Sequence, residues 1–225
     1  MNKLRNKGRS AIRQGFLSVP SLFACLLLSA ATAPSNETSL LAKAMDWKQG
    51  DVIADVGAGG GELAFAAHTY VDPSGKVYAT ELDPKKLEAL RQELARRSWK
   101  NFEVLAAAEK DTNLPPACCD GILLRRVYHH LTAPVEMDAS LYRSLKAGGL
   151  LAVIDFPPRA WLTLSDPVSG VPANRGGHGI PQKILIGELT AAGFSVEKIY
   201  NTWPNDDYCV IFRKPAAASP ARYSE

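Results

Sequence analysis

The sequence has few cysteines, and their spacing matches no familiar metal or disulfide pattern. Cys25 lies in an apolar segment near the start, and the others are Cys118, Cys119 and Cys209. Adjacent cysteines are not a metal-ligand spacing, and the chain has no CxxC pair. The sequence therefore predicts neither a zinc site nor a disulfide framework, and we expect no bound metal.

The net positive charge of the chain disappears once the first 33 residues are set aside. The chain has a formal net charge of +3, but residues 1–33 contain five basic residues and no acidic one. Subtracting these five charges from +3 leaves −2 for the remainder. A mildly acidic domain has no bias toward nucleic acid, so we expect no nucleic-acid partner.

Charged residues are absent between Arg13 and Glu37. This gap holds an apolar run over residues 21–31, and an A-x-A cleavage pattern ends at Ala33. If it is not cleaved, the uncharged stretch is long enough to span a bilayer. We therefore expect residues 1–33 to be a signal peptide or membrane anchor, which predicts an exported protein. If the start codon is placed too early, the alternative is a cytoplasmic protein.

The rest of the chain has the composition of a folded domain. It is 225 residues long with 46% hydrophobic and 22% charged residues, which suits one α/β domain with a real core. No internal repeat is visible. We assign this domain to residues 34–214, and we expect residues 215–225, rich in Ala, Pro and Ser, to form a disordered tail.

The stretch DVIADVGAGGGEL, residues 51–63, organises the domain. Residues 52–56 are an apolar run of the kind that forms a buried parallel strand. Four glycines follow, and glycine allows both a sharp turn and the close approach of a ligand. The apolar residues after the glycines predict a helix. Strand, glycine turn and helix together make the first βα unit of a nucleotide-binding fold.

The dinucleotide pattern G-x-G-x-x-G is not fulfilled in this stretch. From Gly57 its third glycine falls on Glu62, and from Gly59 the match is to a relaxed form only. The stretch is better described as Asp55-x-Gly57-x-Gly59-x-Gly61. Asp55 and Glu62 would repel a phosphate, whereas a cationic amino-acid group would tolerate both.

An acidic residue also closes the second predicted strand. This strand covers residues 76–80, and Glu81 follows 20 residues after Gly61. A carboxylate at that point can accept hydrogen bonds from both ribose hydroxyls of a nucleoside. The remaining pattern predicts helices, strands, a turn and a loop. We expect helices at 39–47, 135–146 and 181–192, and a further helix that begins at Asp83. We expect strands at 102–106, 120–124, 150–154, 195–200 and 208–212. A turn is expected at 147–149 and a loop at 161–177.

Three segments carry a resemblance to a known family. They are DVGAGGG at 55–61, LLRRVYHHL at 123–131 and LKAGGLLAVIDF at 145–156. In this order they resemble the class I S-adenosylmethionine-dependent methyltransferases, from about Ser39 to Pro215. The resemblance implies an α/β fold with a Rossmann-like seven-stranded sheet, mostly parallel with an antiparallel last strand, and helices on both faces. The tight connection between the last two predicted strands agrees with this sheet.

The resemblance also implies a function and a set of sites. We expect S-adenosylmethionine as the cofactor, methyl transfer to an unidentified small-molecule acceptor, and cofactor contacts from Asp55, Gly57, Gly59, Gly61, Glu81, Leu82, Glu109 and Leu124. The acid that the family places after the third strand falls here on Ala107, and Glu109 is the nearby carboxylate. Loss of this adenine contact would weaken cofactor binding.

Candidate catalytic residues follow the carboxyl ends of the predicted strands, where open α/β sheets bind ligands. They are Tyr128, His129, Asp155 and His178, with His130 beside them. Methyl transfer depends mainly on alignment, and it needs a base only if the acceptor arrives protonated. The spacing of His129, His130 and Asp155 matches no known ligand pattern, so a metal site there is not expected.

Two other function classes stay open at this stage. An exported binding protein with the same fold would retain a nucleoside without turnover, and Ala107 and the leader both favour it. A nicotinamide-dependent oxidoreductase would bind NADH in preference to S-adenosylmethionine.

Overall fold

The computed structural model describes residues 36–165, 168–172, 175 and 177–216. The expected leader and most of the expected tail lie outside these residues. Within the described part of the chain, no helix combines the length and apolar character needed to cross a bilayer.

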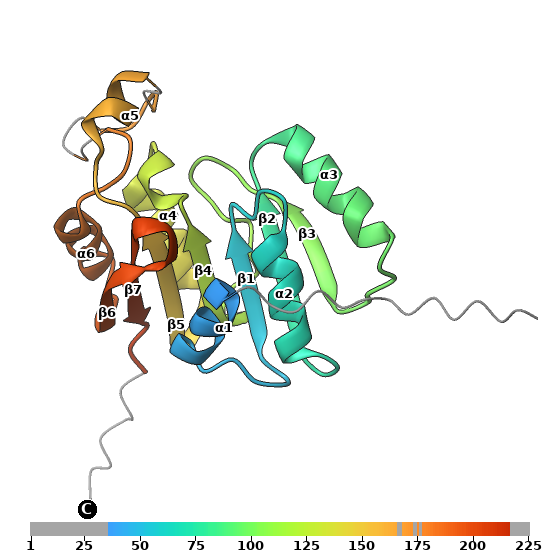
Figure 1. The fold of residues 1–225 in the computed structure, drawn as a ribbon. Helices are drawn as coiled ribbons and strands as arrows, with labels where there is room; N and C mark the ends of the chain where they lie inside the picture. The colour runs from blue at the N-terminus through green and yellow to red at the C-terminus, as the bar shows by residue number, and fades with distance from the viewer. Residues whose placement is uncertain (1–35, 166–167, 173–174, 176, 217–225) are drawn as a thin grey trace, which may run out of the picture. The chain divides into compact units, whose positions relative to one another are not determined.

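A single seven-stranded sheet is the centre of the described fold (Figure 1). Its strand order is β3-β2-β1-β4-β5-β7-β6. The first five strands are parallel, and β7 runs antiparallel to both of its neighbours. This arrangement confirms the predicted fold class. The strands are β1 (Val52–Val56), β2 (Lys76–Glu81), β3 (Phe102–Ala106), β4 (Cys119–Arg125), β5 (Leu145–Asp155), β6 (Ser195–Trp203) and β7 (Asp207–Arg213).

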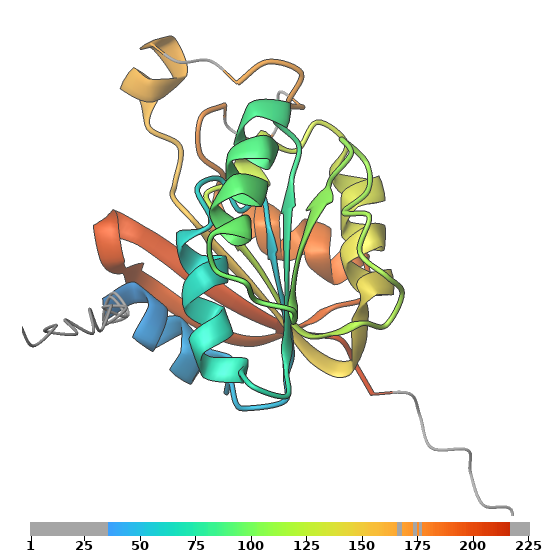
Figure 2. The same ribbon diagram turned by 90° about the vertical axis from the view of Figure 1, so that its right-hand side faces the viewer.

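Helices cover both faces of the sheet (Figure 2). One face carries α1 (Asn36–Ala44), α2 (Glu62–Val71) and α3 (Pro84–Ala95), and the other carries α4 (Pro134–Ser144) and α6 (Gln182–Ala191). Each face has its own cluster of buried apolar side chains, because the strands are apolar on both sides. Short helices also occur in the described residues at η1 (Tyr128–His130), α5 (Ala160–Ser165) and η3 (Pro204–Asp206).

Two predicted boundaries are wrong. Residues 147–149 do not form a turn, because β5 already begins at Leu145. Backbone hydrogen bonds tie this part of β5 to the end of the chain, from Gly148 to Lys214 and from Lys214 to Gly149. The predicted loop at 161–177 contains the helix α5, which stands apart from the sheet in Figures 1 and 2.

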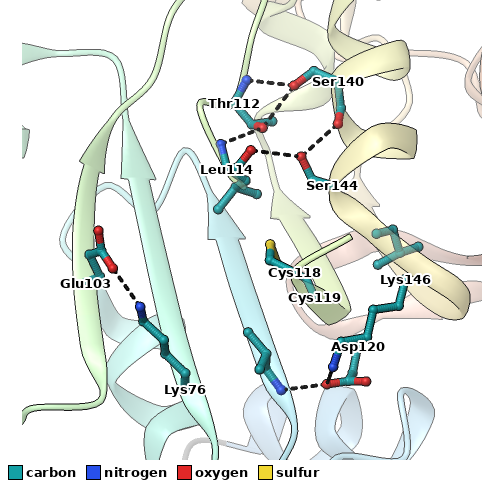
Figure 3. Close-up of a disulfide and its surroundings, with 12 residues drawn as sticks. Lys76, Glu103, Thr112, Leu114, Cys118, Cys119, Asp120, Ser140, Ser144 and Lys146 are labelled. Atoms are coloured by element: carbon teal, nitrogen blue, oxygen red, sulfur yellow. Dashed lines mark hydrogen bonds and ion pairs between the residues drawn. A yellow bond between two sulfur atoms is a disulfide. The ribbon is translucent and has the colours of Figure 1, made fainter. Parts of the chain in front are cut away.

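Cys118 and Cys119 are joined by a disulfide at the start of β4, although the sequence predicted no disulfide framework (Figure 3). A disulfide between adjacent residues needs no framework, so spacing rules do not reveal it. The next residue, Asp120, accepts hydrogen bonds from the Val52 amide and the Lys146 ammonium group at 2.9 and 2.7 Å. These bonds connect β1, β4 and β5 at the amino-terminal ends of the parallel strands, opposite the end at which the cavity described below lies.

Candidate cofactor and acceptor sites

The glycine turn after β1 is built from three residues with positive φ. Gly57, Gly59 and Gly61 have φ of 73°, 55° and 86°. A Cβ atom on Gly57 would lie 2.6 Å from Val127, and one on Gly61 would lie 2.6 Å from Leu90. A Cβ on Gly59 would meet no described atom within 4 Å. Packing within the protein therefore requires Gly57 and Gly61, whereas Gly59 leaves open space beside the turn.

Glu81 fastens the glycine turn to the end of β2. Its Oε2 accepts a hydrogen bond from the Gly59 amide at 2.9 Å, and its Oε1 accepts from the amides of Leu82 and Asp83 at 2.8 and 2.9 Å. The side chain is 7% exposed. A carboxylate has about four acceptor positions, so these three bonds hold the group in place and leave capacity for a ligand hydroxyl.

A cavity of about 510 Å³ lies over this turn at the carboxyl ends of the parallel strands. Six of the predicted cofactor residues line it: Asp55, Gly57, Gly59, Glu81, Leu82 and Glu109. Gly61 and Leu124 do not line it. Gly61 caps the start of α2, and Leu124 is fully buried in the core cluster on the α4 side.

Sequence reasoning missed several residues of this cavity. Lys86 reaches it from α3, and Arg125 and Arg126 reach it from the end of β4. Thr132 and Met137 line it near α4. The position of the two arginines directly after an apolar strand was the available signal, since ligands bind at the carboxyl ends of such strands.

Asp55 is the most buried acidic group of the cavity, at 3% exposure. Burial raises its pKa to about 7, because the charged form loses its hydration. The Ala64 amide and the Arg125 charge oppose this rise, and the charges of Glu81 and Glu62 add to it. A cation placed beside this group would favour its ionised form.

Ala107 occupies the position where the family pattern has an acid. Its backbone amide donates to the Glu81 carbonyl at 3.0 Å, and the residue lines the cavity together with Ala108 and Glu109. Glu109 is thus the carboxylate that this loop presents to the cavity.

Tyr128, one of the predicted catalytic candidates, lies in the core. It is fully buried and lines neither this cavity nor the one described next. Its hydroxyl donates to Asp138 Oδ2 at 2.9 Å, and burial raises the pKa of Tyr128 far above its usual value. The turn of η1 directs Tyr128 into the core and the histidines that follow it toward the carboxyl ends of the strands.

The predicted residues His129 and His178 line a second cavity of about 300 Å³, together with His130. Arg126, Phe156, Arg159 and Leu162 complete its walls. The ring centroids of His129 and His130 are 4.0 Å apart, and those of His129 and His178 are 5.2 Å apart. Arg126 and His130 line both cavities, so the two adjoin along these side chains.

Asp155 orients His129 and is itself fully buried behind it. Asp155 Oδ1 lies 2.8 Å from His129 Nδ1, and Oδ2 accepts a hydrogen bond from the His129 amide at 3.1 Å. The Phe156 amide donates to Oδ1 at 2.9 Å. Asp155 lines neither cavity, so it acts on the site through His129 and does not contact an acceptor.

Arg175 holds the histidine turn in place, and sequence reasoning did not single it out. It is 1% exposed and donates to the carbonyls of Leu131 and Tyr128 at 2.8 and 3.1 Å. Its guanidinium also pairs with Glu188 on α6 at 3.0 Å. A charged residue in a glycine-rich segment gives no sign of burial, because its partners are distant in sequence.

A family model described as a methyltransferase domain matches residues 54–153, which include the glycine turn, Glu81 and the β4 end. Over these residues the chain is similar to the methyltransferase-domain family. The match spans β1 to β5 and therefore most of the larger cavity.

Curated relatives and a solved structure agree with this family. The 2-phytyl-1,4-beta-naphthoquinone methyltransferase of Arabidopsis thaliana is 34% identical over 125 residues, which cover 50% of this chain and 46% of that protein. A protein-L-isoaspartate O-methyltransferase of Ignicoccus hospitalis is 27% identical over 113 residues, covering 50% and 51%. The chain thus spans about half the length of these curated relatives.

The fold extends beyond the family match. A crystal structure of a SAM-dependent methyltransferase from Aquifex aeolicus has a TM-score of 0.66, with 23% identity, and the comparison covers 79% of this chain and 89% of that one. The likeness at this identity concerns the fold alone.

The methyltransferase domain fits S-adenosylmethionine, the cofactor of its family. The open space at Gly59 is one that a side chain would fill, and Glu81 retains acceptor capacity for the ribose. Asp55 offers a carboxylate to a cationic group. The adenine end departs from the family pattern at Ala107, with Glu109 on the same loop.

Proposed function

We propose that this chain transfers a methyl group from S-adenosylmethionine to a small molecule bound in the histidine-lined cavity. The observation that carries this proposal is the common wall of the two cavities. Arg126 and His130 line both, so a ligand on the glycine turn and a second ligand beside the histidines would adjoin. Methyl transfer is a direct displacement, and it requires such an arrangement of donor and acceptor.

Each part of the larger cavity has a distinct role in holding the cofactor. Glu81 accepts a hydrogen bond from a ribose hydroxyl, Gly59 lets the ligand approach the backbone, and Asp55 faces its cationic amino-acid end. When bound, S-adenosylmethionine supplies a methyl group activated by a sulfonium. The protein contributes position, and it removes the acceptor from water.

The histidine cavity provides the acceptor end. Asp155 fixes the ring of His129 through Nδ1, which leaves Nε2 as the nitrogen that can act on a ligand. His178 reaches the same cavity from the segment that follows α5. We expect His178→Ala to reduce turnover while leaving cofactor affinity unchanged. Unchanged turnover would remove His178 from the acceptor site.

Calorimetric titration of the full chain with S-adenosylmethionine, S-adenosylhomocysteine and NADH tests the cofactor assignment. We expect binding of the first two and none of NADH. Gly59→Arg should abolish binding, because its side chain fills the open space beside the turn. Gly187→Arg is the matched control, since Gly187 is exposed on α6 and also has no described atom within 4 Å of its Cβ position.

The outcomes separate the function classes. Preference for NADH would indicate an oxidoreductase. Tight binding of S-adenosylmethionine without turnover of any acceptor would favour the alternative of a non-catalytic binding protein. The observation that favours this alternative is Ala107, which stands where the family pattern has an acid. Cofactor binding that survives Gly59→Arg would contradict the assigned site.

We further propose that residues 1–33 direct export, and that the domain acts outside the cytoplasm. Supporting observations are the basic start, the apolar run and the A-x-A pattern, and the Cys118–Cys119 disulfide fits an oxidising compartment. Protease accessibility in spheroplasts tests this. The double variant L26R/L27R should make the domain inaccessible, and equal accessibility of both forms would argue against export.

A further inference from the structure

Three of the four histidines of the chain gather at one point of the fold. His129, His130 and His178 each offer a ring nitrogen within 4.8 Å of those of the other two. His129 and His130 come from η1 after β4, and His178 comes from the segment before α6. The fourth histidine, His68, is buried on α2 beside Trp99. Two segments far apart in the sequence therefore converge through these side chains.

His129 has the features of a metal ligand supported by a carboxylate. Asp155 Oδ1 lies 2.8 Å from its Nδ1, and the pair is buried, with side-chain exposures of 0% and 1% for Asp155 and His129. Its Nε2 is also buried, and it has no hydrogen-bond partner among the described residues. A buried nitrogen without a partner is costly unless a ligand completes it. Histidines that bind metals characteristically donate the other ring N–H in a hydrogen bond to a carboxylate, and Asp155 is placed to accept such a bond.

We propose that His129, His130 and His178 bind a divalent transition metal ion, for which Zn²⁺ fits best. Three imidazoles with no carboxylate suit zinc and its neighbours, whereas Mg²⁺ and Ca²⁺ prefer oxygen ligands. A tetrahedral zinc site with bonds of about 2.1 Å places its nitrogens roughly 3.4 Å apart. The three ring nitrogens must move slightly closer to reach this spacing. The exposed side chain of His130 is not tightly packed on its solvent side and can make this adjustment. Three protein ligands leave the fourth position open toward the cavity.

The surrounding charges define what the open position would take. Arg126 and Arg159 line the same cavity, and both oppose a bare cation. Arg126 is neutralised by Asp207, whose Oδ2 lies 2.8 Å from its Nε, and Asp155 places a further carboxylate behind His129. An oxygen or sulfur anion would be attracted by the metal. If the proposed methyl transfer holds, the metal would bind the ionised oxygen or thiolate of the acceptor and keep it nucleophilic.

Zinc titration of the untagged full chain, without cofactor, tests metal binding by itself. We expect one Zn²⁺ per chain, and a loss of affinity of roughly tenfold or more in His130→Ala and in His178→Ala. His68→Gln is the matched control, because it removes the remaining histidine and should leave affinity unchanged. Circular dichroism of each variant confirms folding, and both cluster variants lie at the cavity wall, where truncation leaves the core intact.

Cobalt substitution identifies the ligands directly. Co²⁺ bound to three histidines should give visible d–d bands of four- or five-coordinate cobalt without a thiolate charge-transfer band, and these bands should disappear in His178→Ala. No zinc binding, or binding that survives both cluster variants, would overturn the proposal. A thiolate band would place the metal on cysteines and overturn it as well. Cofactor binding is measured separately, so a failed zinc titration leaves the proposed methyl transfer standing.

Discussion

At the scale of single residues, the three glycines of the turn have different roles. Gly59→Ala places a methyl group in open space, so the free energy of unfolding should fall by only about 1 kcal/mol from the positive φ. Its affinity for S-adenosylmethionine should fall at least tenfold. Gly61→Ala forces a Cβ against Leu90 and Phe65 and should cost about 3 kcal/mol. Urea unfolding and calorimetry of both variants measure the two effects, and equal stability losses would contradict this division.

Asp55 makes the stability of the domain depend on pH. Its pKa is about 7 in the folded chain, against an ordinary value of 3.8. Between these values the folded state holds a proton that the unfolded state has released, so Asp55 reduces stability as pH rises through this window. Above pH 7 the effect is complete, and about three pKa units correspond to roughly 4 kcal/mol.

Asp55→Asn should therefore be more stable than the native chain at pH 8 and nearly equal to it at pH 4. Asparagine keeps the side-chain oxygen that accepts from the Ala64 amide, so the comparison isolates the charge. Asp46→Asn is the control, because the Asp46 side chain is 90% exposed and should show no such pH dependence. Urea unfolding at several pH values measures this, and parallel curves for Asp55→Asn and the native chain would contradict the buried charge.

At the scale of elements, Arg175 joins η1 to α6. Arg175→Ala would leave Glu188 without its partner and two carbonyls without donors, so stability should fall by about 4 kcal/mol. Arg175→Lys keeps the charge but not the fork of donors, and its loss should be intermediate. Arg96→Ala is the control, because this exposed arginine pairs with Glu93 at the end of α3, and its loss should cost below about 1 kcal/mol. A similar loss of stability in all three variants would show that the buried hydrogen bonds of Arg175 do not hold η1 to α6.

The sequence predicted the elements whose local signals agree with the sheet. Residues 52–56, the glycine turn and Glu81 were placed correctly, because apolar runs and glycines report directly on buried strands and turns. The antiparallel β7 was predicted from a tight connection to β6. The start of β5 was missed, because residues 147–149 have turn composition but pair with Lys214.

The functional residues were less predictable, because sequence position does not give side-chain direction. Tyr128 and His129 are neighbours, yet one enters the core and the other faces the cavity. Leu124 lies on β4, which does lead to the cavity, but its side chain is buried in a core cluster and does not line the cavity. The grouping of His130 with His178 depends on the segment before α6 returning to η1, and no spacing rule contains that information.

At the scale of the whole molecule, cofactor binding should raise the temperature of unfolding. A ligand present at one hundred times its dissociation constant contributes about 2.7 kcal/mol, which shifts the transition of a domain of this size by roughly 5–10 °C. We expect this shift with S-adenosylhomocysteine and none with NADH, measured by differential scanning calorimetry. Gly59→Arg should abolish the shift, whereas Gly187→Arg should retain it. A shift of equal size with NADH would contradict the cofactor assignment.

The place of β7 has a consequence for the order in which the chain can be made and folded. This strand comes last in the sequence but lies between β5 and β6 in the sheet. A nascent chain that ends before Asp207 therefore exposes the edge of β5 and leaves β6 with no strand beside it. The edge of β5 can be covered only after synthesis has passed Arg213, so this edge stays without a partner strand until nearly the whole domain has been made.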